Sequence, residues 1–429
     1  MSIAMPFAVG ARRALSLSVG LSVGLFVAMP AAAQTTVNFL SAQNDDVFQP
    51  VIDAFEAANP DIDVVHQTVP FDELNTAVET RVGRGDGSID VFAADTPRIP
   101  AFASRGYLLN LDDRRAEIEA AVPNAVEIEL VSHDGSIWAY PMWTSSQLLY
   151  YNRDLLEAAG VEAPSGDPNE RATWEEIVSN ARAAQEAGAT WGVVIQQIDR
   201  YYQLQPLFES AGAGSGLTGD DLLEPALMSD AWVATAEWYG ELHESGIAPR
   251  GIAVSQTDDL FSRGEVAYFV GGPWAIGRFN GAEGLNYGVA PHPYFEGGEP
   301  VTPTGAWALA INPSADNLEA AQKFVEFVTL TTEGSFLTTE NFPLIPVHEG
   351  GFAEYSKAIG EMTPRIGPAI DIMAYEGQNT AVARPRTVGY VAFETEMNRA
   401  FGDIRNGVPA AEVLEQAQQR LERMLPRQR

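Results

Sequence analysis

The chain of 429 residues is 46% hydrophobic and 20% charged, which is typical of a globular protein and excludes a disordered one. At this length two domains are expected, with ample room for a buried core. The 58 acidic residues outnumber the 26 basic ones and give a formal net charge of −32, so a phosphate backbone would be repelled and no nucleic-acid partner is expected. Cysteine is absent, so we expect neither a disulfide nor a lipid-anchored terminus.

Residues 1–33 predict a secretory signal peptide. Two arginines, Arg12 and Arg13, precede an apolar run that is short for a membrane span, and an A-x-A pattern ends at Ala33. We expect export by the general secretory route, with the twin-arginine route as the alternative, and cleavage between Ala33 and Gln34. The mature chain would then be a freely diffusing periplasmic protein.

Strand and helix patterns alternate directly after this segment. Strand patterns rich in β-branched and aromatic residues lie at 35–43, 61–69 and 88–95, and helix patterns lie at 45–60 and 71–82. This β-α-β-α-β order predicts a parallel or mixed sheet flanked by helices. Binding residues are expected where the strands end, which places Gln43 after the first strand and Asp95 and Arg98 after the third.

A second α/β region is predicted from about Leu148 onwards. Thr173 and Glu176 have the capping-box spacing at the start of a helix, and the strand pattern 191–196 follows that helix. Further strand patterns lie at 266–270, 287–295 and 304–312, and the last hundred residues have mostly helical patterns.

The strand pattern that begins at Val266 ends in Gly271-Gly272-Pro273, and Trp274 follows directly. Glycine and proline are ordinary turn residues. A turn does not require the largest aromatic side chain behind it. Trp274 therefore either fills the core beneath the turn or forms part of a binding surface.

Several stretches follow one another in the order of a known family. The chain resembles the extracytoplasmic solute-binding proteins of carbohydrate ABC transporters, the maltose-binding-protein-like group called family 1. The stretches that carry the resemblance are "FEAANPDIDV" (55–64), "DVFAADTPRIPAFASRGYLLNLDD" (90–113), "YPMWTSSQLLYYNRDLLEAAGVEAP" (140–164), "TWEEI" (173–177), "FSRGEVAYFVGGPW" (261–274), "NYGVAPHPYF" (286–295) and "INPSADNLEAAQKFVEFV" (311–328).

The resemblance implies an α/β fold of two lobes, each a mixed or parallel sheet flanked by helices, with a ligand cleft at the hinge. The chain would pass between the lobes several times. We expect the N-terminal lobe to comprise 34–143 and 295–328 and the C-terminal lobe to comprise 144–294 and 329–429.

The resemblance also implies a site that binds a sugar. Trp274 would be an aromatic floor for the sugar ring, with Trp143 as a second platform. Arg98 and Asp95, on the loop after the third strand, would meet the sugar hydroxyls. The remaining expected contacts are Tyr201, Tyr202, Trp307, Gln43, Ser145 and Arg386. For each of them a structural role in the core or on the surface is the alternative.

The same residues argue against other activities. We find no nucleophile elbow, zinc signature or phosphate loop, and Asp95 is the only carboxylate in the expected cleft segments, so no catalytic residue and no cofactor are expected. A carbohydrate hydrolase remains the enzyme alternative. Adjacent tyrosines also occur in ferric-iron carriers, but neither His66 nor His292 has metal-ligand spacing, so no metal site is expected.

The sequence therefore predicts a monomeric periplasmic receptor that captures a mono- or oligosaccharide and delivers it to the transmembrane subunits of an ABC permease. A uronate, a polyol, a polyamine or ferric iron is the alternative solute. Arginine pairs well with a carboxylate, which keeps the uronate open.

Overall fold

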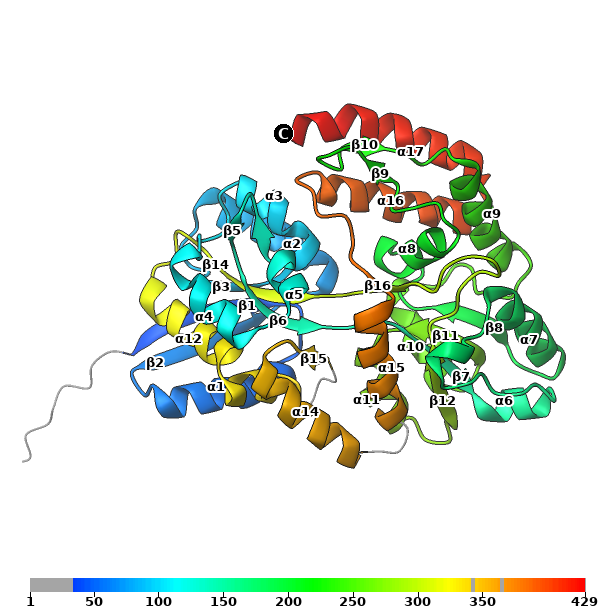
Figure 1. Cartoon of the computed structure of the whole chain (residues 1–429), viewed down its shortest axis with the longest axis horizontal. Coiled ribbons are helices and arrows are strands. Elements are labelled where there is room, and N and C mark those ends of the chain that lie inside the picture. The colour runs from blue at the N-terminus through cyan, green and yellow to red at the C-terminus, as the bar shows by residue number, and fades with distance from the viewer. Residues whose placement is uncertain (1–33, 341–343, 363–365, 429) are drawn as a thin grey trace, which may run out of the picture. The chain divides into compact units, whose positions relative to one another are not determined.

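A computed structural model describes residues 34–340, 344–362 and 366–428. The described residues form two α/β lobes, each built on its own sheet (Figure 1). The predicted signal peptide lies outside the described residues. Within those residues, no helix combines the length and the apolar character that crossing a membrane requires.

The first lobe contains a six-stranded sheet in the order β15-β6-β14-β3-β1-β2. Strand β1 runs parallel to β2 and β3, whereas β14 runs antiparallel to β3 and β6. The predicted mixed sheet is therefore confirmed. Its strands are β1 (Thr35–Ser41), β2 (Ile62–Thr68), β3 (Val91–Asp95), β6 (Tyr140–Thr144), β14 (Trp307–Ile311) and β15 (Ile345–Pro346).

The helices of this lobe follow from their amphipathic patterns. Helix α1 (Asp45–Ala58) buries the predicted face of Val47, Val51, Ile52 and Phe55, and Asn59, which precedes a proline, is its C-cap. The other helices are α2 (Phe71–Arg81), α3 (Ile99–Ser104), α4 (Arg115–Ala121), α5 (Ala125–Leu130), α12 (Leu318–Leu330) and α13 (Thr332–Leu337).

The second lobe contains a four-stranded sheet in the order β12-β7-β11-β8. Strand β7 runs antiparallel to β11 and β12, and β8 runs parallel to β11. The strands are β7 (Leu148–Asn152), β8 (Trp191–Ile195), β11 (Val266–Gly271) and β12 (Tyr287–Pro291).

Helix α7 (Trp174–Glu186) begins with the predicted capping box: the Glu176 backbone N–H donates to Thr173 Oγ1 at 3.2 Å, and the Thr173 N–H donates to Glu176 Oε2 at 2.9 Å. The remaining helices of this lobe are α6 (Arg153–Ala158), α8 (Tyr201–Ser210), α9 (Asp230–Glu244), α10 (Thr257–Ser262), α11 (Ile276–Gly281), α15 (Ile366–Asn379), α16 (Tyr390–Arg405) and α17 (Ala410–Met424). Helix α14 (Glu349–Met362) packs against α13 and β15 of the first lobe and against α15 of the second. Short strand pairs join β4 (Ser132–His133) to β5 (Ser136–Ile137), β9 (Leu217–Thr218) to β10 (Glu224–Pro225), and β13 (Thr302–Pro303) to β16 (Ala381–Val382).

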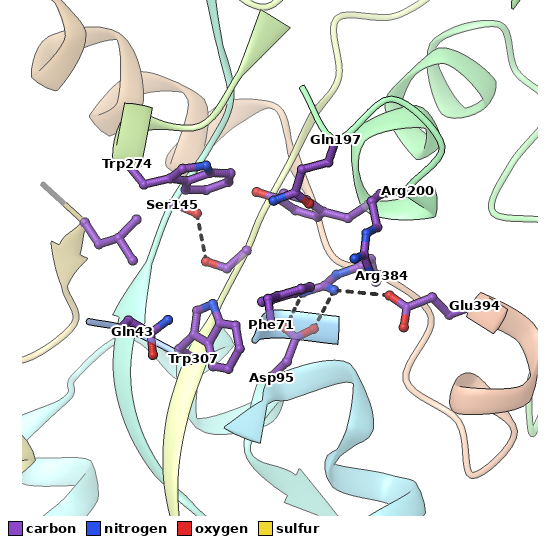
Figure 2. A pocket seen from close by; sticks show the side chains of 13 residues that line it. Gln43, Phe71, Asp95, Ser145, Gln197, Arg200, Trp274, Trp307, Arg384 and Glu394 are labelled. Carbon is purple, nitrogen blue, oxygen red and sulfur yellow. Dashed lines mark hydrogen bonds and ion pairs between the residues drawn. The ribbon is translucent and has the colours of Figure 1, made fainter. Parts of the chain in front are cut away.

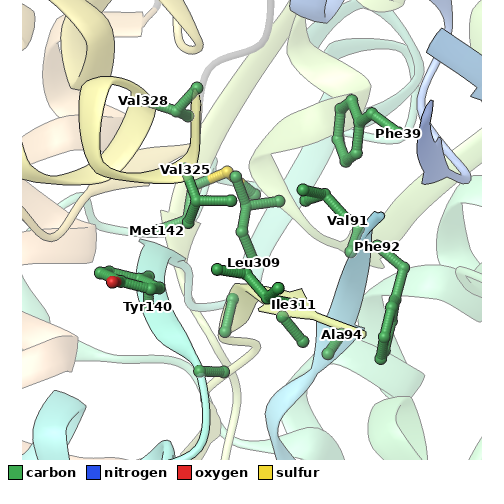
Figure 3. Packing of buried hydrophobic residues seen from close by; sticks show 14 of the residues in the cluster. Phe39, Val91, Phe92, Ala94, Tyr140, Met142, Leu309, Ile311, Val325 and Val328 are labelled. Carbon is green, nitrogen blue, oxygen red and sulfur yellow. The ribbon is translucent and has the colours of Figure 1, made fainter. Parts of the chain in front are cut away.

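Each lobe has its own hydrophobic core. In the first lobe, side chains of the sheet pack against α12, with Leu309 and Met142 facing Val325 (Figure 3). In the second lobe, alternate residues of β7 enter different clusters: Leu149 belongs to the cluster on one face of the sheet and Leu148 to the cluster on the other. A strand buried on both faces reads as a continuous hydrophobic run, which is why the stretch around Leu148 lacks a polar alternation.

The chain passes between the lobes at three places. The first two lie between β6 and β7 and between β12 and β14. The third differs from the boundary predicted after residue 328. Helix α13 packs against α1 and α12, and β15 pairs with β6, so the first lobe extends to Pro346. Helical periodicity in the sequence indicates that one face of a helix is buried, but it does not indicate which lobe that face packs against.

A buried carboxyl group gives the stability of the fold a dependence on pH. Glu127 of α5 is 6% exposed, and burial raises its pKa to about 7, although a hydrogen bond from Thr144 acts in the opposite direction. The folded state thus binds this proton more tightly than the unfolded chain, and the unfolding free energy falls as the pH rises from about 4.5 through about 7.

We therefore expect Glu127→Gln to be more stable than the wild type at pH 8, by up to about 3 kcal/mol, and nearly equal to it in stability at about pH 4. Urea unfolding at the two pH values measures this difference. Glu237→Gln, at an exposed position of α9, is the control and should behave as the wild type does at both. Equal stabilities of Glu127→Gln and the wild type at pH 8 would contradict the prediction.

Candidate ligand-binding site

A pocket lies between the two lobes and takes its lining from both (Figure 2). About 710 Å³ of empty space lies within it, its open mouth included. The lining residues are Gln43, Phe71, Asp95, Ser145, Gln197, Arg200, Tyr202, Trp274, Gly305, Trp307, Leu344, Arg384 and Glu394.

The pocket brings together six of the ten residues predicted from the sequence, namely Gln43, Asp95, Ser145, Tyr202, Trp274 and Trp307. Trp307 begins β14, where it lies opposite Asp95 at the end of β3. These residues come from segments far apart in the chain, and they meet because the strand ends and interlobe segments that carry them face one another.

Two of the other predicted residues belong to the hydrophobic cores. Trp143 is 0% exposed, stacks on Phe48 with ring centroids 5.5 Å apart, and donates from Nε1 to Thr338 Oγ1 at 2.8 Å. Tyr201 packs edge-on against Phe393, and its hydroxyl donates to the Ser215 carbonyl at 2.7 Å. Neither side chain lines the pocket.

The last two predicted residues, both arginines, form ion pairs near the pocket but outside its lining. Arg98 donates to Asp95 and to Glu394. Arg386 forms an ion pair of 2.9 Å with Glu129 of the first lobe. Both side chains bridge parts of the protein itself.

The Gly-Gly-Pro-Trp turn is held by side chains from two neighbouring strands. The Gly272 N–H donates to Gln196 Oε1 at 2.9 Å, and the Tyr150 hydroxyl donates to the Gly272 carbonyl at 2.8 Å. The indole of Trp274 lies against Gly272 so closely that a Cβ at position 272 would be 2.1 Å from the ring. Glycine is thus required for the indole to take this position.

We expect Gly272→Ala to displace the Trp274 ring and to weaken ligand binding by about 10-fold or more. The added methyl group cannot fit, because what it would meet is a rigid ring pressed against the backbone. Gly277→Ala in α11 is the matched control, since a Cβ there meets nothing within 4 Å. Isothermal titration calorimetry of both variants makes the comparison, and equal affinities would contradict this account of the turn.

Two rows of side chains run along the pocket. In the first, the tilted rings of Trp274 and Tyr202 lie 6.2 Å apart, and the Arg384 guanidinium carbon is 4.7 Å from the centre of the Tyr202 ring. In the second, Trp307 meets Phe71 edge-on at 5.9 Å, and the Arg200 guanidinium carbon is 5.0 Å from the centre of the Phe71 ring. Each row therefore begins with a tryptophan and ends with an arginine.

A buried cluster of charges joins the lobes beside these two rows of side chains. Asp95 of the first lobe accepts from Arg384 of the second at 2.7 Å, and it also accepts from Arg98. Glu394 of α16 accepts from Arg98 and, at 3.0 Å, from the Tyr390 hydroxyl. Burial would raise the pKa of Asp95, but Arg384 and Arg98 outweigh it and hold that pKa below its ordinary value.

The turn after β8 carries backbone strain at the pocket wall. Gln197 and Ile198 have φ angles of 55° and 36°, in the left-handed region that a β-branched residue rarely occupies. The Tyr239 hydroxyl donates to the Ile198 carbonyl at 2.8 Å and helps to hold this conformation. Strained backbone of this kind is concentrated at functional sites, and here it places Gln197 and Arg200 in the pocket.

Several lining residues were not among those predicted from the sequence. Arg384 and Glu394 carry no local signal of their own, because the arginine stands in an extended segment and the glutamate in a helix of the far lobe. The motif "RPRTVGY" predicted an arginine here but selected Arg386, two positions away. The turn at Gln197 has left-handed backbone angles but contains no glycine, so the sequence does not predict it.

Among the described residues no group of three or more His, Asp or Glu side chains is arranged to hold a metal ion. His66 bonds to Ser41 Oγ at 2.8 Å, and burial of His292 lowers its pKa to about 3. Neither of these two histidines, which were considered as ligands for ferric iron, lines the pocket. The arrangement in the pocket is suited instead to an uncharged ring face and to groups that accept hydrogen bonds.

The fold and this pocket define a solute-binding protein of two lobes. The family described as "Bacterial extracellular solute-binding protein" matches residues 41–333 of the chain, and the chain belongs to that family. The predicted family and two-lobe fold are confirmed, and the family places the protein outside the cytoplasm.

Relatives of known name share about a quarter of their residues with the chain. The maltodextrin-binding protein MdxE of Bacillus subtilis is 25% identical over 252 residues, 57% of this chain and 57% of its own length. A putative binding protein of Brucella abortus is 25% identical over 329 residues, 73% of this chain and 75% of its own. The match to MdxE thus spans little more than half of that relative.

Solved structures agree in fold over nearly the whole chain. The GacH receptor of Streptomyces glaucescens, whose structures include a complex with acarbose, has a TM-score of 0.78 at 24% identity and covers 92% of this chain and 99% of its own. Lmo0181 from Listeria monocytogenes, in complex with cycloalternan, has a TM-score of 0.80 at 21% identity with the same coverage. At these identities the likeness shows the fold alone.

Proposed function

We propose that the protein is the substrate-binding component of an ABC importer, which captures a sugar in the interlobe pocket and delivers it to the membrane permease. The observation that carries this proposal is the pairing of two partly buried tryptophans, Trp274 and Trp307, with polar side chains in one pocket between the lobes. The maltodextrin-binding relative and the acarbose complex support the same substrate class.

The physical fit is that of an aromatic surface to a sugar ring. A pyranose presents an apolar face of C–H groups, which a rigid indole covers at low cost in conformational entropy, while its hydroxyl groups point to the rim. The Gln43 Oε1 atom is buried without a hydrogen-bond partner among the described residues and would accept from such a hydroxyl. Ser145 also lines the pocket, and its hydroxyl donates to the Gly305 carbonyl at 3.0 Å.

The remaining parts of the proposal rest on the sequence and the family. A signal peptide cleaved between Ala33 and Gln34 would release a monomer into the periplasm. There the closed, loaded form would meet the transmembrane subunits of the permease. Closure about the interlobe strands would bury the ligand from both sides.

The two carboxylates of the pocket, Asp95 and Glu394, argue against the alternative function of a carbohydrate hydrolase. Glycoside hydrolysis requires one carboxyl group to be protonated as an acid beside a second that is ionised. Asp95 and Glu394 both accept hydrogen bonds from arginines, and the pKa of Asp95 is lowered rather than raised. We therefore assign binding rather than hydrolysis to the pocket.

Thermal unfolding of residues 34–429 against a panel of solutes tests the proposal. The panel contains neutral sugars, uronates, polyols, polyamines and ferric citrate. A solute at about 100 times its Kd should add roughly 2.7 kcal/mol to the unfolding free energy, a shift of several degrees. Stabilisation by a sugar is expected. Stabilisation by polyamines or ferric iron alone, or turnover of a chromogenic glycoside, would overturn the proposed function.

A further inference from the structure

One side of the pocket is closed by charged residues that pair across the two lobes. Asp95 of the first lobe accepts from Arg98 and Arg384, and Glu394 of the second lobe accepts from Arg98. We call these four residues the interlobe cluster, and each of them is between 3% and 8% exposed. Figure 2 shows Asp95, Arg384 and Glu394 on one side of the pocket and Trp274 on the other. The cluster is therefore a wall at one end of the pocket.

The hydrogen bonds of this wall are made within the protein. Asp95 accepts through Oδ1 from Arg384 and through Oδ2 from both Arg98 and Arg384. Glu394 accepts through Oε2 from Arg98 and through Oε1 from the Tyr390 hydroxyl. A ligand that pushed one of these side chains aside would leave a buried charge without its partner, which is strongly unfavourable. The cluster is thus a barrier that a ligand meets rather than one that it displaces.

The lobes meet again behind the wall. A second hollow, of about 190 Å³, lies on the far side of Arg384, and both Arg384 and Arg386 line it. Arg386 in turn forms an ion pair of 2.9 Å with Glu129 of the first lobe. At Arg384 the wall is therefore one side chain deep, and the contact between Arg386 and Glu129 lies behind it.

The surfaces suited to sugar rings are few. Four aromatic side chains line the pocket, but two of them, Tyr202 and Phe71, each have a guanidinium of the protein over one ring face, at 4.7 and 5.0 Å. Trp274 and Trp307 remain as the main platforms, since a rigid indole covers the apolar face of a sugar ring. Two tryptophans provide for one or two rings.

We infer that the pocket takes one end of a short saccharide, of one or two rings, whose terminal ring lies against the interlobe cluster. This inference rests on the proposed function and narrows its substrate class. A groove open at both ends would hold an internal segment of a long chain, whereas a pocket closed at one end selects a terminal ring. The wall is packed among its own partners, so it leaves no room for a further ring.

A series of sugar lengths tests the inference. Isothermal titration calorimetry compares the mono-, di-, tri- and pentasaccharides of α-1,4-linked glucose, β-1,4-linked glucose and β-1,4-linked galactose. In a series that binds, the longer members should bind no more tightly than the disaccharide, to within about threefold, because their additional rings find no further platform. A trisaccharide or pentasaccharide that exceeds this limit would overturn the inference and leave the proposed function in place.

Substituted ligands test whether one end of the sugar is enclosed. A 4,6-O-ethylidene group extends the non-reducing end of the tightest-binding sugar, and a methyl glycoside extends its reducing end. At least one of the two derivatives should bind about 10-fold or more weakly than the parent sugar, because the end at the wall cannot be extended. A smaller loss in both derivatives would contradict the closed end.

Arg384→Ala identifies the wall. The variant joins the pocket to the hollow behind it, and it leaves Asp95 paired with Arg98. The excluded derivative should therefore recover at least about threefold relative to the parent sugar. Arg386→Ala is the matched control, because Arg386 does not line the ligand pocket, and it should exclude the derivative as the wild type does. The ratio of the two affinities within one variant is unaffected by a general loss of binding, and thermal unfolding without ligand confirms that each variant is folded.

The outcomes separate the two levels of the proposal. An unchanged ratio in Arg384→Ala would overturn the inference alone. If that variant does not fold, the length series and the substituted ligands decide the question on the wild type. Absence of binding in all three series, together with stabilisation by a non-sugar solute alone in the thermal panel, would overturn the proposed function and the inference with it.

Discussion

Trp274→Ala is expected to weaken sugar binding by about 100-fold or more, the largest effect of any single substitution in the pocket. The indole offers a rigid face to the ligand, and truncation of a central aromatic anchor typically costs about 2–4 kcal/mol. Folding should be little affected, because the indole is only partly buried and packs against the core of the opposite lobe rather than inside its own.

Calorimetric titration of Trp274→Ala and Trp274→Phe with the best ligand measures this effect. The phenylalanine variant should retain much of the affinity, since a smaller aromatic face remains. Trp238→Ala serves as the control, because Trp238 of α9 is likewise half-buried and packs against Trp174 and Phe295, outside the pocket. Wild-type affinity in Trp274→Ala would show that the ligand binds elsewhere.

The elements of the fold could be predicted where local physics decides them. The β-α-β-α-β order at the start of the mature chain, the capping box at Thr173 and the amphipathic face of α1 all follow from short-range patterns, and the structure contains each. The end of the first lobe could not be predicted in this way. Strand β15 pairs with β6 across some two hundred residues of sequence, and only tertiary contacts place it there.

The candidate site could be predicted only to within a residue or two. Tyr202 lines the pocket whereas the adjacent Tyr201 is buried in the second core, because neighbouring helical side chains point about 100° apart. Arg384 reaches the pocket, whereas Arg386 pairs with Glu129 of the other lobe. In both cases the sequence predicts the residue type near a site, and the direction of the side chain depends on packing that the local sequence does not encode.

Removal of one charge from the interlobe cluster is expected to shift the protein toward an open form. Glu394→Gln leaves the buried Arg98 with Asp95 as its one remaining carboxylate partner in the cluster, and breaking a buried ion pair in this way typically costs about 3–5 kcal/mol. Opening restores water to Arg98, so the cost falls on the closed form. Small-angle X-ray scattering of ligand-free protein should therefore detect a larger radius of gyration in Glu394→Gln than in the wild type.

The matched control lies on the same helix. Glu396 forms an ion pair of 2.6 Å with Arg420, and both residues belong to the second lobe, so Glu396→Gln should lower the unfolding free energy without changing the radius of gyration. Affinity is the poorer measurement here, because Glu394 lines the pocket and its loss also changes the surface that meets the ligand. The double variant Arg98→Gln/Glu394→Gln also removes the guanidinium that lost one of its two carboxylate partners, and it should recover part of the closed population. An unchanged radius in Glu394→Gln would mean that the aromatic contacts between the lobes, rather than the ion pairs, determine closure.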